Sequence, residues 1–496
     1  MRKTLTLILV AGVFTACNSK PEHSASQNAS LGTCRAEGSS INVMLGSLPQ
    51  NTLADSFVYT TGQQVYMPVY DSVFRTDNNY RMGSRILKSW IASDDFIQYT
   101  FTLSEGLKFA NGKPLTSNAL KVMFEPGMKS LYVSDSVRRL VKKIKVIDDK
   151  TIEVFLKRPY SMFPALLSDF KNIVVPEDET MSPWPSGSGA FEVCYRSPKT
   201  IIIQRRKSPV TVSAEVQQIR YVLPESVPVD SKQIADNAIS FFPFISVSDM
   251  EVIAKKYSKY RFLSQRVKAV IFNIPDFNVR KALATCIDRD ALMQHPFLSD
   301  SSYRYDFILA NGVENFSNGV PLQTLCSPYK GSKLNKPVTF ISFYDMPGAK
   351  EFMENYIKAW SIRANVPMAI ETVATADLPA RLSEKKYDIA MIGIGPKSPL
   401  AEGLFLEFAN GGSERSVIGF SSARVNQAYE KYLSAGPSES LSAVREVEKE
   451  IRTDYLAVPL AMQTITFYIP KEWVNFSQST SLAGVFDLTH LSVGKN

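Results

Sequence analysis

Histidine is scarce in this chain of 496 residues, which contains only His23, His295 and His490. They lie far apart in the sequence, so a histidine-rich metal site is not expected. The nucleophile elbow Gly-x-Ser-x-Gly is also missing, because the SGSG that begins at Ser186 has the wrong spacing. The segment GIGPKS (393–398) lacks the four-residue gap of a phosphate loop. These absences argue against an enzyme, and we expect no catalytic residue, no metal and no cofactor.

Long apolar runs and clustered charge are scarce as well. Beyond the N-terminus no run approaches 18 apolar residues, so no further membrane segment is expected. The net charge is +8, but the basic residues are dispersed. The densest basic cluster, RRLVKKIK (138–145), fits a solvated face beside a strand. Nucleic-acid binding is therefore not expected, whereas a weak attraction to anionic lipid or an acidic ligand stays open.

The N-terminus carries a targeting signal. Residues 1–16 combine a basic start, MRK, with the apolar run TLTLILVAGVF, and they predict a signal peptide. The run ends in small residues before Cys17 and resembles the lipoprotein signal of bacteria, which implies cleavage before Cys17 and its lipidation. An ordinary signal peptide with a chance cysteine is the alternative, and both versions place the chain outside the cytoplasm. Residues 17–38 are polar and small and predict a flexible tether.

Four cysteines remain if Cys17 carries lipid: Cys34, Cys194, Cys286 and Cys326. An even number in an oxidising compartment indicates two disulfides, for which three pairings exist. Free buried thiols are the alternative, above all for Cys286, because it lies on the apolar face of a predicted helix.

The second half of the chain has the most regular pattern. Strands and helices alternate as β-α-β-α-β over 338–344, 349–360, 367–373, 378–386 and 387–395. This order predicts a parallel sheet covered by helices, and such sheets bind ligands beyond the carboxyl ends of their strands. Two loops follow strands there, and they supply our candidate ligand-binding residues: Asp345, Met346, Gly348, Gly395, Pro396, Lys397 and Ser398.

Helix caps and further elements can also be predicted. Asn278 is expected to cap a helix, Asp288 a second turn and Asp377 a short helix. In the first half, 40–48, 151–160, 200–207 and 217–224 predict strands, and near the C-terminus a helix (439–455) precedes a long strand (456–469). The aromatic run at Phe241, Phe242 and Phe244 fits a core better than a ligand-stacking surface.

The segment SWIASDDFIQYTFTLSEGLKFANGKPLT (89–116) resembles the signature of the family 5 extracytoplasmic solute-binding proteins, the oligopeptide- and dipeptide-binding components of ABC importers. Asn111-Gly112 predicts a turn with positive φ, and Thr116 predicts a helix N-cap. Five more segments resemble the family in the same order: 69–77, 141–176, 185–193, 269–292 and 364–393.

The resemblance implies an α/β, two-lobed periplasmic-binding-protein-like fold (type II, class C) with two hinge strands, near 266–273 and 457–466. The implied domains are a signal peptide (1–16), a lipidated tether (17–38), lobe 1 (39–265 plus 457–496, with an inserted subdomain at about 51–168) and lobe 2 (266–456). These boundaries put two of the four cysteines in each half of the chain, which favours the pairs Cys34–Cys194 and Cys286–Cys326.

The resemblance also implies function. The protein would be a monomer that captures a peptide-like or other small polar ligand, delivers it to an ABC-type permease and touches the membrane only through its lipid. In peptide-binding family members a loop aspartate receives the α-amino group of the peptide, and a second aspartate follows shortly before a proline. Gly395 and Ser398 stand at these two positions here, and Leu53-Ala54-Asp55 replaces an early Leu-Asp-Pro. We therefore expect an anionic, N-blocked or sugar-like ligand near Lys397 and the helix at Gly348. A solvent-facing Lys397, and a receptor, sensor or scaffold with a degenerate cleft, are the alternatives.

Overall fold

The computed structural model describes residues 34–35, 39–45, 48–49, 60–76, 82–125, 130, 132–169, 172–207, 216–223, 238–240, 250–295, 298, 304–310, 313–316, 321, 325–342, 348–373, 377–396, 400–411, 416–436, 438–474, 488 and 492–493. The signal peptide, Cys17, most of the tether, the aromatic run 241–244 and residues 53–55 lie outside this set. Among the described helices, none combines the length and the apolar composition of a membrane span.

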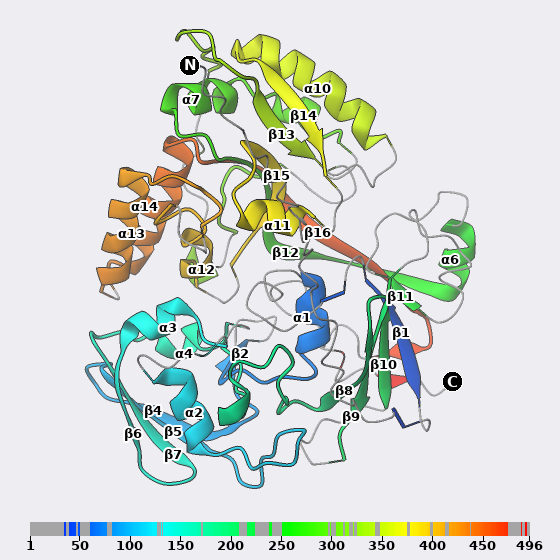
Figure 1. The fold of residues 1–496 in the computed structure, drawn as a ribbon, viewed down its shortest axis with the longest axis vertical. Helices are drawn as coiled ribbons and strands as arrows, with labels where there is room; N and C mark the ends of the chain where they lie inside the picture. Colours follow the sequence, from blue (N-terminus) through cyan, green and yellow to red (C-terminus); the bar gives the residue numbers. More distant parts are fainter. Residues whose placement is uncertain are drawn as a thin grey trace, which may run out of the picture.

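One ten-stranded sheet runs through the molecule in the order β14-β13-β15-β12-β16-β11-β1-β10-β9-β8 (Figure 1). In that order its strands are Met368–Thr372, Val338–Ser342, Ile389–Ile394, Tyr257–Phe272, Ala457–Pro470, Ala238–Ser240, Ser40–Met44, Gln218–Val222, Thr200–Arg205 and Phe191–Ser197. The central pair, β12 and β16, is antiparallel and connects the two ends of the sheet. The expected hinge segments lie within these two strands.

The second half folds as the β-α-β-α-β pattern predicts. Strand β13 pairs in parallel with both β14 and β15. Helix α10 (Ala349–Ala364) and helix α11 (Leu378–Ser383) make the connections. Further helices of this half are α7 (Phe277–Thr285), α8 (Arg289–Leu292), α12 (Glu402–Phe405), α13 (Ala423–Ser434) and α14 (Ser440–Thr453), with a 3-10 turn, η4, at Val313–Asn315.

The first half adds a separate four-stranded sheet in the order β4-β5-β7-β6 (Figure 1, cyan and blue). Its strands are Leu87–Ala92, Gln98–Leu103, Thr151–Leu156 and Val141–Val146. Helices α2 (Ser117–Phe124), α3 (Asp135–Leu140) and α4 (Phe163–Leu166) accompany it. The remaining elements are α1 (Thr60–Tyr66), α6 (Met250–Lys256), a 3-10 turn η2 (Glu177–Glu179) and the strand pairs β2–β3 (Arg75–Thr76, Met82–Gly83) and β17–β18 (Trp473–Val474, Ser492–Val493).

The apolar core is divided between the two ends of the molecule. Strand β12 is buried on both faces: Val267 and Ala269 belong to one cluster, and Val270 and Phe272 to another. Strands β1 and β10 share a separate core, and the four-stranded sheet packs around a further one that includes Phe101. Because each end of the long sheet has its own core, the molecule has the two-lobed architecture that the family resemblance implies.

Local predictions have mixed outcomes. Asp288 accepts from the amide of Ala291 at 2.9 Å, as a cap should. The cap of α7 is Asp276 and not Asn278, because the Asp276 carboxylate accepts from the amide of Asn278 itself at 2.8 Å. Thr116 and Asp377 occupy N-cap positions, but neither side chain makes a capping hydrogen bond. Gly112 has φ +84°, as expected.

Two disulfides join the cysteines in the pairs that the implied lobes favour. Cys34 is bonded to Cys194, and Cys286 is bonded to Cys326. The first bridge holds the start of the described chain against β8. The second ties helix α7 to the segment before β13, so Cys286 is a buried half-cystine and not a free thiol.

The glycines of the segment 185–193 make a close backbone contact. A Cβ on Gly187 would lie 2.0 Å from the carbonyl oxygen of Val69, and one on Gly189 would lie 2.4 Å from that of Pro68. We expect Gly187→Ala to lower the free energy of unfolding by roughly 2 kcal/mol or more, because backbone atoms must move. Urea unfolding checks this. Gly83→Ala is the control, since nothing lies within 4 Å of its added Cβ, and equal effects would contradict the explanation.

Candidate functional site

Gly395 and Pro396, the residues that directly follow β15, lie against the central strand β12. A Cβ on Gly395 would lie 2.9 Å from both the Cγ of Arg266 and the carbonyl oxygen of Gln265, so this position admits only glycine without movement. Arg266 also donates to the carbonyl oxygen of Gly393. Gly395 and Pro396 are therefore buried against the hinge strand β12, at the carboxyl end of β15.

The other predicted site residues divide into two groups. Gly348 is exposed and forms the N-cap of α10 with φ +75°, a backbone conformation that suits glycine. It follows the carboxyl end of β13, which pairs with β15. Asp345, Met346, Lys397 and Ser398 lie outside the described residues. The sheet therefore brings the loops after β13 and β15 to one edge, as the parallel order requires.

Beyond this loop the chain reaches the first half of the molecule. Leu400 is fully buried, and it belongs to the core of the four-stranded sheet, whose other members lie between residues 73 and 174. Two residues later, the Glu402 carboxylate accepts from the hydroxyl of Tyr160 at 3.4 Å. Figure 1 shows the corresponding helices, α12 above α3 and α4. The segment 400–402 therefore bridges the two lobes.

Glu402 belongs to a group of buried hydroxyl and carboxyl side chains that sequence reasoning missed. The hydroxyl of Tyr429 donates to Glu402 at 3.5 Å. Nearby, Glu314 accepts from the hydroxyl of Tyr432 at 2.9 Å and from the amide of Ala401 at 3.0 Å. The one available signal was an acidic residue inside the apolar run PLAEGLFLEF (399–408), where a buried carboxylate needs partners.

The electrostatics of this cluster follow from burial. Burial raises the pKa of the Glu402 carboxyl, while the hydroxyls of Ser136 and Tyr160 and the charges of Arg158 and Arg139 act in the opposite direction. Burial likewise raises the pKa of Glu314, against the hydrogen bonds that it accepts. A low-dielectric environment disfavours the charged form of a carboxyl group, so the cluster favours protonated carboxyls more than water does.

A second polar network connects the family-like segments of lobe 1. The buried carboxylate of Asp71 accepts from Arg85 Nε at 2.8 Å and from the hydroxyl of Ser188 at 3.1 Å. Arg75 lies 3.2 Å from the same carboxylate. Burial by itself raises the pKa of Asp71, but the two guanidinium groups outweigh it and hold the pKa below the ordinary value. The segments 69–77 and 185–193 thus meet at one ion cluster.

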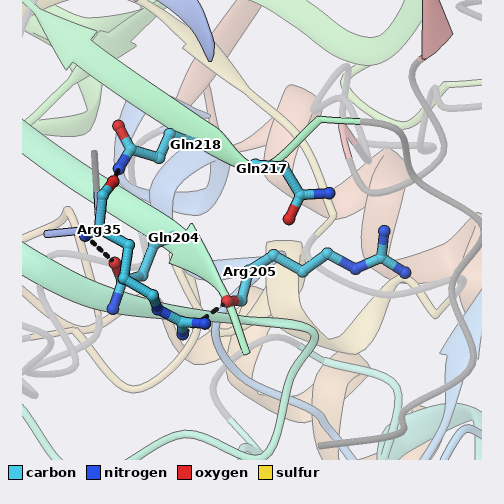
Figure 2. A pocket seen from close by; sticks show the side chains of 5 residues that line it. All are labelled: Arg35, Gln204, Arg205, Gln217 and Gln218. Atoms are coloured by element: carbon cyan, nitrogen blue, oxygen red, sulfur yellow. Dashed lines mark hydrogen bonds between the residues drawn. The ribbon is translucent and has the colours of Figure 1, made fainter. Parts of the chain in front are cut away.

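A polar hollow lies beside strands β9 and β10 of lobe 1, lined by Arg35, Gln204, Arg205, Gln217 and Gln218 (Figure 2). It encloses about 200 Å³ of space open to solvent. The amide of Arg35 donates to Gln204 at 2.9 Å, and its guanidinium donates to the carbonyl oxygen of Arg205 at 3.0 Å. Since its walls bond to each other and it lies on β9 and β10, this hollow seats the N-terminal segment and is not our candidate site.

His295 packs against helix α10, with its ring 5.3 Å from that of Phe352. Burial, with a smaller effect of Lys268, lowers the pKa of His295 to about 4. The folded state therefore holds the neutral imidazole, and its stabilisation is complete above pH 6.5 and lost as the pH falls towards 4. Within the described residues no group of three or more His, Cys, Asp or Glu side chains is placed to hold a metal ion.

This shift of the His295 pKa predicts a pH dependence. Between pH 6.5 and 4, His295 should cost the wild type on the order of 3 kcal/mol of unfolding free energy. His295→Gln should lack this part of the slope, because glutamine does not titrate. Chemical unfolding of both proteins at several pH values measures the difference, and identical slopes would contradict a buried neutral imidazole.

A match to the family described as bacterial extracellular solute-binding proteins, family 5 Middle, covers residues 82–415. The chain belongs to this family. It is 24% identical over 270 residues to the glutathione-binding protein GsiB of Escherichia coli, and 24% identical over 346 residues to heme-binding protein A of Haemophilus influenzae.

These alignments cover 48% and 59% of this family 5 chain, and the chain spans 50% and 61% of the respective relatives. Similarity of fold extends further. The dipeptide-binding protein of Pseudoalteromonas sp. SM9913, solved with Met-Leu, superimposes with a TM-score of 0.77 at 15% identity, over 92% of this chain and all of that one. The comparison therefore supports the two-lobed solute-binding fold over nearly the whole chain.

Proposed function

We propose that this family 5 protein captures a peptide-like or other small polar ligand between its lobes and delivers it unchanged to an ABC-type permease. The lobes would be 39–265 plus 457–496, with an inserted subdomain at about 51–168, and 266–456. The observation that carries the proposal is the loop after β15, which rests on the hinge strand at Gly395 and reaches the other lobe at Leu400. A loop so placed can close over a ligand when the lobes move together.

The ligand would lack a free α-ammonium group. Positions 395 and 398, where the family resemblance places carboxylates, are Gly395 and Ser398. An ammonium group brought into the cleft would lose its hydration there without gaining a counter-charge at those positions. Loop residues Asp345, Met346, Gly348, Pro396 and Lys397 complete the proposed site, and Lys397 with the helix N-terminus at Gly348 favours an anionic group.

We further propose that the protein works as a monomer anchored outside the cytoplasm through lipid on Cys17. The family is one of extracellular proteins. The basic, apolar and small-residue sections before Cys17 support a lipoprotein signal. The part of the tether before Cys34, which is bonded to Cys194 of lobe 1, would then hold the lobes away from the membrane and leave them free to meet the permease.

Ligand competition tests the proposal. Isothermal titration of the purified protein with N-acetyl-Met-Leu, Met-Leu and the anionic N-acetyl-Asp-Glu should show binding of one or both N-blocked peptides in preference to Met-Leu. A micromolar complex corresponds to a binding free energy of about −8 kcal/mol. Preference for Met-Leu would overturn the assignment of the ligand class. Binding of none of the three, with no small molecule retained from the host, would favour a receptor, sensor or scaffold with a degenerate cleft.

A further inference from the structure

The cluster of hydroxyl and carboxyl groups between the lobes has the composition of a pH-sensitive contact. We propose that Glu402 makes lobe closure depend on pH, with its protonated carboxyl favouring the closed state and its ionised carboxylate favouring the open state. This inference deepens the proposed function, because it assumes that the same two lobes open and close.

Because Glu402 lies at the boundary between the lobes, exposure of its carboxyl group to water depends on whether the lobes are closed. The residue projects from α12 of lobe 2, and it is only 3% exposed. Its partner across the boundary, Tyr160, belongs to the unit of the four-stranded sheet, as does the core that receives Leu400. When the lobes separate, Leu400 leaves that core and the Glu402 carboxyl meets water. The cost of removing this carboxylate from water is therefore paid only in the closed state.

In the closed state, no positively charged side chain among the described residues donates a hydrogen bond to the Glu402 carboxylate. Hydroxyl groups of Tyr160, Tyr429 and Ser136 are its hydrogen-bond partners among the described residues. The titratable and charged groups around it come from the segment after β7, from α3, from η4 and from α13: Arg158, Tyr160, Arg139, Glu314, Tyr429 and Tyr432.

The two arginines act at a distance and favour the carboxylate, but burial outweighs them and raises the pKa of Glu402. The guanidinium of Arg158 lies over the ring of Tyr160, 5.1 Å from its centroid. Glu314 bears a second carboxyl group beside the cluster, and Glu402 contributes to raising its pKa. Like-charge repulsion between these two groups adds to the preference for protonation.

The sign of the coupling follows from these pKa values. Closure raises the pKa of Glu402, so the closed state binds more protons than the open state. The ratio of closed to open molecules should then fall by up to tenfold per pH unit, beginning near the ordinary carboxyl pKa of about 4.3 and ending at the pKa of the closed state. Acid would favour retention of the ligand, and a rise in pH would favour its release.

Small-angle X-ray scattering of the full chain without ligand, from pH 4.5 to 8, tests the inference. The wild type should show a larger radius of gyration at pH 8 than at pH 4.5. Glu402→Gln, which keeps a neutral group of the same shape, should stay compact throughout. Glu105→Gln, which alters a fully exposed carboxyl, should behave as the wild type. A wild type with no pH dependence, or a Glu402→Gln variant that retains it, would overturn the inference.

A second variant remains informative if Glu402→Gln folds poorly. In Tyr160→Phe the carboxyl keeps its charge but loses a donor that lowers its pKa, so the midpoint of opening should move to higher pH. An unchanged midpoint would remove Tyr160 from the contact. All these measurements are made without ligand, so they test the inference separately from the proposed function. If Glu402 controls opening but the protein binds no small molecule, the proposed function is refuted and this inference stands.

Discussion

Asp71→Asn is expected to lower the free energy of unfolding by about 3–5 kcal/mol. The Asp71 carboxylate is almost completely buried and is the shared partner of Arg75 and Arg85. Removal of its charge takes a shared carboxylate away from two guanidinium groups, each at least four-fifths buried. Breaking a buried ion cluster is far more costly than losing an exposed ion pair, and urea unfolding at pH 7 measures the difference.

Glu105→Gln is the matched control for Asp71→Asn. Glu105 pairs with Lys150 at 2.7 Å, but both side chains are at least half exposed. The solvated pair should contribute far less to stability than the buried Asp71 cluster, because water screens its attraction. Similar losses of unfolding free energy in the two variants would mean that burial does not determine how much the Asp71 cluster stabilises the protein. They would also contradict a stabilising role for the cluster where segments 69–77 and 185–193 meet.

Glu448→Gln is expected to have an effect of similar size in the other lobe, also about 3–5 kcal/mol. Glu448 and Arg452 lie one turn apart on α14, and the guanidinium contacts both carboxylate oxygens at 2.7 and 2.8 Å. Glu448 also accepts from the amide of Ile308 at 3.1 Å. Both ionic side chains are at most 5% exposed, so neutralising Glu448 leaves the charge of Arg452 buried and uncompensated.

The control for this variant lies on the same helix. Glu446 pairs with Lys431 at 2.6 Å on the surface, and Glu446→Gln should cost less than about 1 kcal/mol. Amide hydrogen exchange then tests the two-lobed account. Asp71→Asn should accelerate exchange chiefly in β8, β9 and β10, and Glu448→Gln chiefly in β13, β14 and β15. Uniform acceleration across the long sheet in both variants would contradict separate cores.

The second half of the fold could be predicted from the sequence because its local and tertiary preferences agree. The stripe that begins at Ala349 and Met353 has helical spacing, and the segments 338–344 and 387–395 are rich in apolar and β-branched residues. Each pattern corresponds to one element of the structure. Caps were harder to predict, since Asp276 and Asn278 are both good capping residues, and only the position at which the backbone turns decides between them.

The bridge between the lobes could not be predicted. Leu400 and Glu402 are close in sequence to the candidate loop, but their partners, such as Tyr160, are more than 200 residues away. Hydrophobic periodicity reports that a residue is buried, not which distant core receives it. Similarly, the sequence showed only that Gly395 lacks the carboxylate that the family resemblance places at this position. The structure adds a positive reason for glycine, because Gln265 and Arg266 occupy the space of a side chain.

Native mass spectrometry of the protein purified from its own host tests the central claim most directly, namely that the two lobes enclose a small molecule and leave it chemically intact. We expect a folded species heavier than the same protein after denaturation by the mass of one small polar compound. Denaturation should release that compound, and the empty protein should bind it again without altering its mass. A protein that carries no compound and rebinds none from a host extract, or one that converts the compound into a different molecule, would contradict the account.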